Sequence, residues 1–581
     1  MRENLRTLLP YLARYRRDLA LGGAALLVKD LMHASLPIFI GRGVDAMRGG
    51  AVQLPAVLWF SAAILAFSAA KGFFQYWMRM ILIGVSRDIE YDLRNDFFLR
   101  LTALSSDFYG RVRTGDIMAR ATNDLNAVRM MLGPGLMYSV ETGFTVLVVV
   151  TVMLVVDWPL TLMALAPAPL ISLAVSYFGH KIHTRFDRIQ KMFSDISSRV
   201  QESIAGVRVV RAYVQEEAEL RQFEKLNREF VAENIKLARL SGAFMPTLQT
   251  LVGVTLLIVL WVGGARLMAG RISLGQFVMF NTYMMILVWP MIAFGWVVNL
   301  AQRGTASLAR INAILKERPS IDEPAAPHPL GQPFRGEIEF REVEVQYPAG
   351  KALDGISLRI PAGATVAIVG HTGSGKTTLV QLIPRIMDPT AGSVLVDGVD
   401  VRRYSPSALR RQIGFVPQET VLFSSTLAQN ISFGVDGATE AGIRRAAELA
   451  GLGPDIESFP DGLATVIGER GITLSGGQKQ RTAIARAILR DPGIVILDDA
   501  LSSVDTVTED RILASLAGLM RGRTTILISH RVSTVRNADR IFVVEKGKLA
   551  EEGSHDELLA AGGYYADLYQ KQLLEEELEA I

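Results

Sequence analysis

Six long apolar segments in the first half of the chain constrain its fold more than any other feature. Each is near or above the length that an α-helix, rising about 1.5 Å per residue, needs to cross about 30 Å of hydrocarbon. Because lipid cannot pair with free backbone polar groups, we expect each segment to be a membrane-spanning helix. The segments cover approximately residues 19–40, 57–85, 136–156, 160–178, 248–267 and 274–300. Residues 1–316 are therefore predicted to form an all-α polytopic membrane domain.

The distribution of positive charge predicts the orientation of these helices. Five arginines precede the first span, and the long loops after the second and fourth spans are rich in arginine and lysine. The positive-inside rule places these loops and both termini in the cytoplasm of a multi-pass protein of the cytoplasmic (inner) membrane. The two loops, roughly 86–134 and 179–244, have helical periodicity, so we expect the spans to continue as helices beyond the bilayer. The first 18 residues lack the short apolar core of a cleaved signal.

Ionisable side chains lie inside several spans, where each is costly unless it faces protein or water. They are Lys29, Asp30, His33, Lys71, Arg79 and Glu141. They can form a polar substrate cavity, or they can form ion pairs between helices or line a water-filled vestibule. A second group of side chains, in the sixth span, can form an adaptable apolar wall that binds substrate, or it can simply pack in the protein core or against lipid. This group contains Met279, Phe280, Met284, Met285, Trp289, Met291 and Trp296.

The composition changes after the last span. Residues 317–335 are polar and proline-rich and read as a linker. Short β-like runs then alternate with helical ones over 336–575, which is typical of an α/β domain with a largely parallel sheet. The last residues, 576–581, form an acidic tail. The wider segment 564–581 reads as an amphipathic helix, either a solvated tail or one that pairs with a partner's tail.

A glycine-rich turn between a predicted strand and a predicted helix indicates a phosphate-binding loop. Glycines let backbone N–H groups approach a phosphate closely, and the following helix N-terminus adds a partial positive charge. Lys376 can reach the β- and γ-phosphates, and the Thr377 hydroxyl can bind Mg²⁺. The loop consists of Gly370, His371, Thr372, Gly373, Ser374, Gly375, Lys376, Thr377 and Thr378.

Further residues follow in an order that suits a nucleotide site. Tyr347 can stack on adenine or be an edge aromatic, and Gln418 can reach Mg²⁺ and the attacking water or be a surface turn residue. Asp498 ends a buried strand, where Mg²⁺ needs a carboxylate. His530 follows another strand and is placed to touch a γ-phosphate. A second glycine-rich turn before a helix is a further anion-binding N-terminus. It contains Ser475, Gly476, Gly477 and Gln478.

These motifs, together with the segment 502–505, resemble in order the nucleotide-binding domain of ABC transporters. With six spans placed before them, the chain resembles a half-transporter of the multidrug exporter family. The resemblance implies an ATP- and Mg²⁺-dependent export ATPase for hydrophobic or amphipathic substrates such as drugs, lipids or peptides. It also implies a head-to-tail dimer in which residues 370–378 of one chain and Ser475–Gln478 of the other enclose each ATP. Segment 465–471, with Glu469 and Arg470, resembles the part that communicates with the membrane loops, whose tips we place near 113–116 and 212–216.

One residue departs from the family pattern. The residue after the strand aspartate is usually a glutamate that orients or deprotonates the attacking water, and here it is Asp499. The shorter side chain moves the carboxylate by about 1 Å, and a displacement of that order can cost about 10²-fold in rate. We therefore expect Mg-ATP to bind and to be cleaved slowly. The hypothesis is a heterodimer whose partner carries the glutamate; the alternatives are a slow homodimer and an aspartate adapted by a backbone shift.

Other functions stay open or are excluded by composition. An ATP-gated regulatory or channel-like subunit would carry the same motifs. A soluble ATPase acting on nucleic acid would need all six spans to be core helices, and the net charge of +3 from 61 basic and 58 acidic residues gives no sign of a nucleic-acid partner. The chain has no cysteine, which excludes disulfides and thiolate metal sites. Membrane lipids are the remaining expected partners.

Overall fold

The computed structural model describes residues 2–48, 54–348, 350–468, 474–504 and 506–579. The chain divides into two compact units, which are described separately. The first contains residues 1–102 and 113–317, and the second contains residues 103–112 and 318–581. The predicted order of a helical membrane domain and an α/β domain is confirmed.

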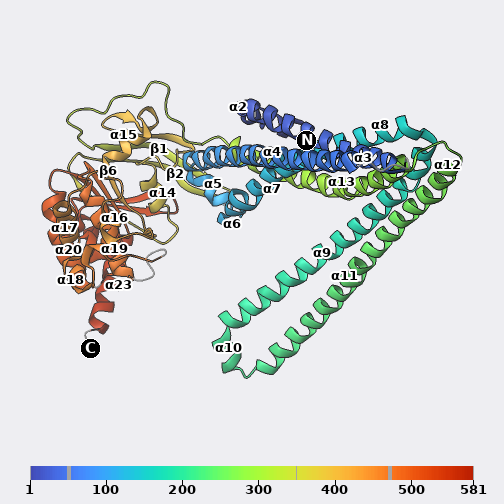
Figure 1. Ribbon diagram of the computed structural model, residues 1–581. Coiled ribbons are helices and arrows are strands. Elements are labelled where there is room, and N and C mark those ends of the chain that lie inside the picture. The colour runs from blue at the N-terminus through green and yellow to red at the C-terminus, as the bar shows by residue number, and fades with distance from the viewer. Residues whose placement is uncertain (1, 49–53, 349, 469–473, 505, 580–581) are drawn as a thin grey trace. The chain divides into compact units, whose positions relative to one another are not determined.

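Long helices build the first unit (Figure 1). They are α3 (Arg16–Arg48), α4 (Leu54–Ala103), α8 (Leu136–Leu165), α9 (Ala168–Ala205), α11 (Glu216–Ile258) and α13 (Leu274–Leu315). Shorter helices connect or extend them: α1 (Arg2–Arg6), α2 (Leu9–Arg14), α6 (Thr114–Ala119), α7 (Leu125–Met130), α10 (Val207–Ala212) and α12 (Gly264–Met268). Within the described ranges, five helical stretches are long and apolar enough to cross a membrane.

The predicted fourth span, 160–178, differs from the other five. It is helical, but it is shared between the end of α8 and the start of α9, with Pro167 at the junction. Between the third and fourth predicted spans, the backbone leaves the helix at Asp157 (φ −157°, ψ 98°). The Asp157 carboxylate then accepts a hydrogen bond from the Leu160 amide at 2.9 Å and pairs with Arg266 of α12 at 2.7 Å.

Helix α13 is fixed at its beginning by α3. Ser273 and Gln276 form a capping box, and the Asp45 carboxylate accepts hydrogen bonds from the Ser273 hydroxyl and the Gly275 amide. The helices approach closely here, since a Cβ on Gly275 would lie 1.9 Å from the Gly41 carbonyl oxygen. The first and last spans therefore meet with almost no side-chain volume between their backbones.

The charged groups of the first span form ion pairs. The Lys29 ammonium lies 2.6 Å from the carboxylate of Asp30 and 2.6 Å from that of Glu141 on α8. Lys29 and Asp30 are each 2% exposed. The Lys29–Glu141 contact matches the interpretation as ion pairing between helices, whereas the Lys29–Asp30 contact lies within α3.

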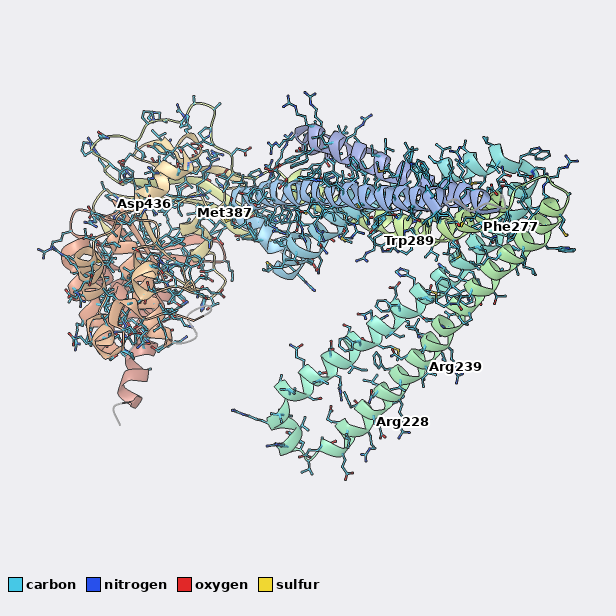
Figure 2. All side chains as sticks on the ribbon, in the orientation of Figure 1. Arg228, Arg239, Phe277, Trp289, Met387 and Asp436 are labelled. Atoms are coloured by element: carbon cyan, nitrogen blue, oxygen red, sulfur yellow. The ribbon has the colours of Figure 1, made fainter. Side chains whose placement is uncertain are left out.

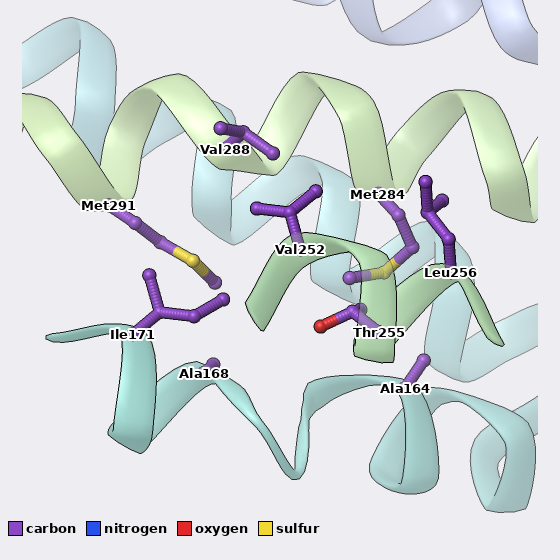
Figure 3. Close-up of a pocket in the computed structure, with 9 residues that line it drawn as sticks. All are labelled: Ala164, Ala168, Ile171, Val252, Thr255, Leu256, Met284, Val288 and Met291. Carbon is purple, nitrogen blue, oxygen red and sulfur yellow. The ribbon is translucent and has the colours of Figure 1, made fainter. Parts of the chain in front are cut away.

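The apolar group of the sixth span, on α13, is divided between buried and exposed positions. Met279, Phe280 and Met284 are buried, whereas Met285 and Trp289 are exposed; Figure 2 labels Trp289. Met284, Met291 and Ile171 line a cavity between α8, α9, α11 and α13, in which Met291 lies opposite Ile171 and Met284 lies near Thr255 (Figure 3). Its free volume is about 10 Å³. Pockets that hold drug-sized ligands have volumes of about 300–1,000 Å³, so this cavity is too small to hold one.

Helices α9 and α11 form a long hairpin whose tip is α10 (Figure 1). The tip agrees with the predicted position near 212–216. The helices run well beyond their apolar parts, and Arg228 and Arg239 project from this polar stretch of α11 (Figure 2). The first inner loop turns earlier than predicted. Residues 114–119 already form α6, and the interruption is the preceding segment 103–112.

Two sheets build the second unit. The smaller, antiparallel sheet has the order β2-β1-β4-β5, and the larger one has the order β10-β9-β3-β8-β7-β6. The first contains β1 (Ile338–Tyr347), β2 (Gly350–Ile360), β4 (Ala391–Val396) and β5 (Val399–Asp400). The second contains β3 (Thr365–Val369), β6 (Ile413–Val416), β7 (Ile494–Asp498), β8 (Thr524–Ile528), β9 (Arg540–Glu545) and β10 (Lys548–Gly553).

The pairing of the large sheet is parallel from β6 through β7, β8 and β3 to β9 and antiparallel only at β10. Strands β7 and β8 are buried along their whole length. Since parallel strands end at the same sheet edge, the segments that follow β3, β7 and β8 must meet there.

Helices lie in the segments that connect the strands of this unit and follow the last strand. They are α14 (Lys376–Gln381), α15 (Pro406–Arg411), α16 (Leu427–Ile431), α17 (Glu440–Leu449), α18 (Gly453–Ser458), α19 (Gly476–Leu489), α20 (Thr506–Met520), α21 (Val532–Val535), α22 (His555–Ala561) and α23 (Tyr564–Glu579). A short helix of the first inner loop, α5 (Ser106–Arg111), also belongs to this unit. Its Ser106 hydroxyl donates to the Ile386 carbonyl at 3.3 Å, and the neighbouring Ser105 hydroxyl accepts from the Ile321 amide at 3.2 Å.

Candidate functional site

The loop after β3 is tightly folded, and only glycine fits two of its positions. Gly370 has φ +151° and Gly375 has φ +104°. A Cβ would lie 2.2 Å from the Val544 carbonyl oxygen at Gly370 and 2.6 Å from the Ala352 carbonyl oxygen at Gly375. The loop therefore holds its backbone in one compact shape and passes directly into α14. This is the concave shape that the glycine pattern predicts.

Lys376 lies inside this loop. The side chain is 6% exposed, and its ammonium donates to the carbonyl oxygens of Gly370 and His371, each at 2.8 Å. Burial lowers the pKa of Lys376, while the carboxylates of Asp498 and Asp499 oppose that shift. A buried ammonium held only by neutral carbonyl groups is well suited to exchange them for the oxygens of a phosphate.

A carboxylate with a free oxygen lies beside the loop. The Thr377 hydroxyl donates to Asp498 Oδ1 at 3.2 Å, and Asp498 Oδ2 has no hydrogen-bond partner among the described residues. Burial raises the pKa of Asp498; the Thr377 hydrogen bond opposes this, and the nearby Asp499 adds to it. A buried carboxylate oxygen without a partner, next to a threonine hydroxyl, is an oxygen donor set that fits Mg²⁺.

A cavity of about 290 Å³ joins these groups to the other predicted residues. Most of the residues predicted for this chain's own side of the site line it: Tyr347, Thr372, Gly373, Gly375, Lys376, Thr377, Thr378, Gln418, Asp498, Asp499 and His530. Burial, followed by the Lys376 charge, lowers the pKa of His530, although Asp499 acts in the opposite direction. His530 is therefore neutral at physiological pH and can donate or accept a hydrogen bond.

The backbone of Asp499 has a conformation that the sequence did not reveal. Its φ is +49°, in the left-handed region, and its amide donates to the Ile528 carbonyl at 2.9 Å. Aspartate and asparagine adopt this region more readily than longer side chains do. The aspartate thus suits the sharp turn that the chain makes at the end of β7.

Gln480 is a contributor to this region that sequence reasoning missed. It is 6% exposed, and its amide group donates to the Ser502 hydroxyl and accepts from the Ser503 amide, both at 2.9 Å. Helix α19 therefore supports the segment that follows Asp499. One feature of the sequence could have pointed to Gln480: it lies in the predicted helix that begins at the second glycine-rich turn.

That second turn is separate from the cavity. Ser475 caps α19 in a capping box with Gln478, whose amide also donates to Asp455 at 2.9 Å. None of the described residues lining the cavity comes from this turn. The two glycine-rich turns predicted to bind phosphate therefore lie at different places in one chain. Glu469 and Arg470, predicted to communicate with the membrane loops, lie outside the described residues.

Taken together, the fold and this site define a P-loop ATPase domain joined to a helical membrane region. The family model of the ABC transporter transmembrane region matches residues 19–291, and the ABC transporter model matches residues 353–502. The chain therefore belongs to the ABC transporters and combines an ABC membrane region with an ABC ATPase domain, as multidrug half-transporters do. An ABC ATPase domain binds ATP and couples its hydrolysis to transport.

Relatives match over nearly the whole chain. The probable multidrug resistance ABC transporter ATP-binding/permease protein YheI of Bacillus subtilis is 39% identical, over 94% of each chain. The ATP-dependent lipid A-core flippase of Syntrophus aciditrophicus is 36% identical, over 95% of this chain and 90% of its own. A bacterial Atm1-family ABC exporter, solved with ATP bound, superposes with a TM-score of 0.80 at 28% identity and covers 96% of this chain and 99% of its own.

Proposed function

We propose that this chain is one half of a heterodimeric exporter and contributes the slow ATP site. The observation that carries this proposal is Asp499, which lines an otherwise complete cavity where the family's usual residue is glutamate. In this proposal Lys376 and the loop amides hold the phosphates, and Thr377, Asp498 and Gln418 hold Mg²⁺. Bound Mg²⁺ would neutralise charge on the phosphates. His530 contacts the γ-phosphate, and Tyr347 stacks on the adenine.

The shorter carboxylate explains slow turnover without weak binding. The residues proposed to bind phosphate and Mg²⁺ are those the motifs require, whereas a carboxylate one methylene shorter would lie about 1 Å from the place where it acts on water. The Ser475–Gln478 turn is intact and capped, so it can complete a site on a partner whose own carboxylate is a glutamate. The partner's site would then carry most of the hydrolysis.

A second chain is also supported by the α9–α11 hairpin. Beyond its apolar part, Phe186, Phe193 and Val200 follow one another at seven-residue spacing on α9 and are all exposed. Apolar side chains repeated along one helix face are typical of a surface that another chain covers.

The substrate that we propose is hydrophobic or amphipathic. The support comes from the names of two relatives, one described as a probable multidrug resistance transporter and one as a lipid A-core flippase.

One observation favours a second candidate, a homodimer in which aspartate does the work of glutamate. The left-handed φ of Asp499 changes the direction of its side chain and can offset part of the lost length. The two candidates predict opposite results for ATP hydrolysis by the full-length chain purified alone in lipid nanodiscs. Under the heterodimer proposal this preparation is slow, and Asp499→Glu accelerates it.

The partner itself can be sought directly. A tagged copy of this chain, purified from its native membrane, should bring down a second half-transporter with glutamate at the position of Asp499. Rapid hydrolysis and transport by the chain alone would contradict the heterodimer. Accumulation of substrate against a gradient in vesicles separates both candidates from an ATP-gated channel, which would only equilibrate it.

A further inference from the structure

The C-terminal helix α23 is part of the ATPase core. Tyr565 is fully buried in a cluster that includes Val532 and Val535 of α21 (Val532–Val535), the helix that follows His530. At the start of α23, the Glu551 carboxylate on β10 accepts hydrogen bonds from the amides of Tyr564 and Tyr565 at 2.6 and 3.3 Å. Its first turns are therefore fixed to both β10 and α21.

Two turns further along, one side chain of α23 binds the backbone on both sides of Arg531. The side-chain oxygen of Gln572, Oε1, accepts a hydrogen bond from the Val532 amide at 2.7 Å. Its side-chain nitrogen, Nε2, donates to the backbone carbonyl oxygen of His530. A glutamine amide that satisfies one donor and one acceptor of the same short segment restrains that segment in two directions. The His530 ring extends from this restrained backbone.

The side chain of Arg531 restrains the segment 530–532 from the opposite side. The Arg531 guanidinium donates to the Val504 carbonyl at 2.9 Å and pairs with the buried Glu509 carboxylate. Arg531 thus links the loop to the stretch that follows Asp499, and Gln572 links it to α23. Helix α23 also reaches the phosphate loop, because the ring of Tyr564 lies edge-on to that of His371 at 4.6 Å between centroids.

We infer that Gln572 is a positioning residue for His530, and that α23 thereby sets the place of the side chain expected to meet the γ-phosphate. The inference rests on the proposed role of His530. Without the amide of Gln572, the segment 530–532 is still held by the Arg531 side chain, which contacts Val504 and Glu509, but it loses the restraint from α23. The imidazole then samples a wider range of positions, which slows a reaction sensitive to displacements below 1 Å.

The test uses the full-length chain in lipid nanodiscs and single-turnover cleavage of radiolabelled Mg-ATP, which measures the chain's slow site directly. Gln572→Leu keeps the approximate length of the side chain and removes both hydrogen bonds. Its matched control is Lys571→Ala, an exposed neighbour on the same helix. We expect Gln572→Leu to slow cleavage about tenfold, with the Kd for a fluorescent ATP analogue within about twofold of the parent, and Lys571→Ala to change neither.

A double variant separates positioning from general stability. In a His530→Ala background, Gln572→Leu should slow cleavage by less than about twofold, because its effect passes through the missing imidazole. An equal slowing in both backgrounds, or a parallel loss of ATP affinity, would overturn the inference. If His530→Ala itself leaves cleavage unchanged, the proposed role of His530 fails instead.

Hydrogen exchange gives a readout that does not depend on catalysis. The amide of Val532 should exchange faster in Gln572→Leu, while amides of the central strand β3 keep the parent rate. Unchanged exchange at Val532 would show that Gln572 does not restrain the loop, and would overturn the inference even if the rate falls.

Discussion

The buried ion pairs of Lys29 make a sharp prediction about stability. Replacing Lys29 by Met removes the one cation that contacts both Asp30 and Glu141. The Asp30 side chain is 1% exposed, and neither of its oxygens has a hydrogen-bond partner among the described residues. The variant would therefore leave a buried carboxylate with neither a hydrogen bond nor its neighbouring charge.

The size of the effect follows from burial. Breaking a buried ion pair by removing one partner costs about 3–5 kcal/mol, because the remaining charge stays desolvated. At about 2 °C per kcal/mol for a domain of this size, the unfolding temperature should fall by about 6 °C or more. Glu141→Gln should cost less, since Lys29 keeps its contact with Asp30 and the Glu141 side chain is 24% exposed.

The assay is thermal unfolding of the full-length chain in detergent, followed by fluorescence, with three variants in parallel. A triple variant, Lys29→Met with Asp30→Leu and Glu141→Leu, removes all three charges together and should recover most of the stability lost by Lys29→Met. If Lys29→Met unfolds at the parent temperature, or if the triple variant is the least stable, the buried charges do not interact as the distances indicate.

Two further predictions concern the ATP site. Gly375→Ala should abolish binding of a fluorescent ATP analogue, because the added Cβ would lie 2.6 Å from the Ala352 carbonyl oxygen. The control is Gly398→Ala, at a position that also has a positive φ but has open space around it. This variant should bind the analogue about as well as the parent. Because burial raises the pKa of Asp498, Mg²⁺-dependent ATP affinity should be complete above that raised pKa and be lost as the pH falls through it, at a higher pH than for an ordinary aspartate. Titration of Mg²⁺ at several pH values checks this, and Asp498→Asn should show weak affinity without that pH step.

The sequence predicted most of the residues that line the candidate ATP cavity, because its signals are local. Glycines 370 and 375, Lys376 and Asp498 are each placed by a short motif at the end of a strand. The motifs pointed to one nucleotide site, and the observed sheet explains why these residues meet, since parallel strands end at one sheet edge. The six apolar segments likewise predicted the helices from length alone, apart from the junction at Pro167, where α8 gives way to α9 within the fourth span.

The sequence could not predict contacts made by single polar residues far apart in the chain. Gln572 and Gln480 look like ordinary surface glutamines, and no spacing rule connects Gln572 to His530, 42 positions earlier. The backbone turn at Asp499 was hidden for a different reason. A left-handed φ is readily inferred for glycine but not for an aspartate that follows a buried strand.

The position of Arg531 explains how these separate contacts act on one site. The carboxyl ends of β3, β7 and β8 carry the phosphate loop, Asp498 with Asp499, and His530, and the strands themselves are buried and hydrogen-bonded in register. A rigid sheet fixes where each loop starts but not where its side chains end. The positions of the side chains are fixed by residues outside the sheet. Gln480 supports the segment after Asp499, and Arg531 links that segment to the loop of His530. Val504 and Arg531 therefore lie between Asp499 and His530. We expect Asp499→Glu to speed hydrogen exchange at Val532 as well as ATP hydrolysis, and unchanged exchange there would show that the two loops are not coupled through these contacts.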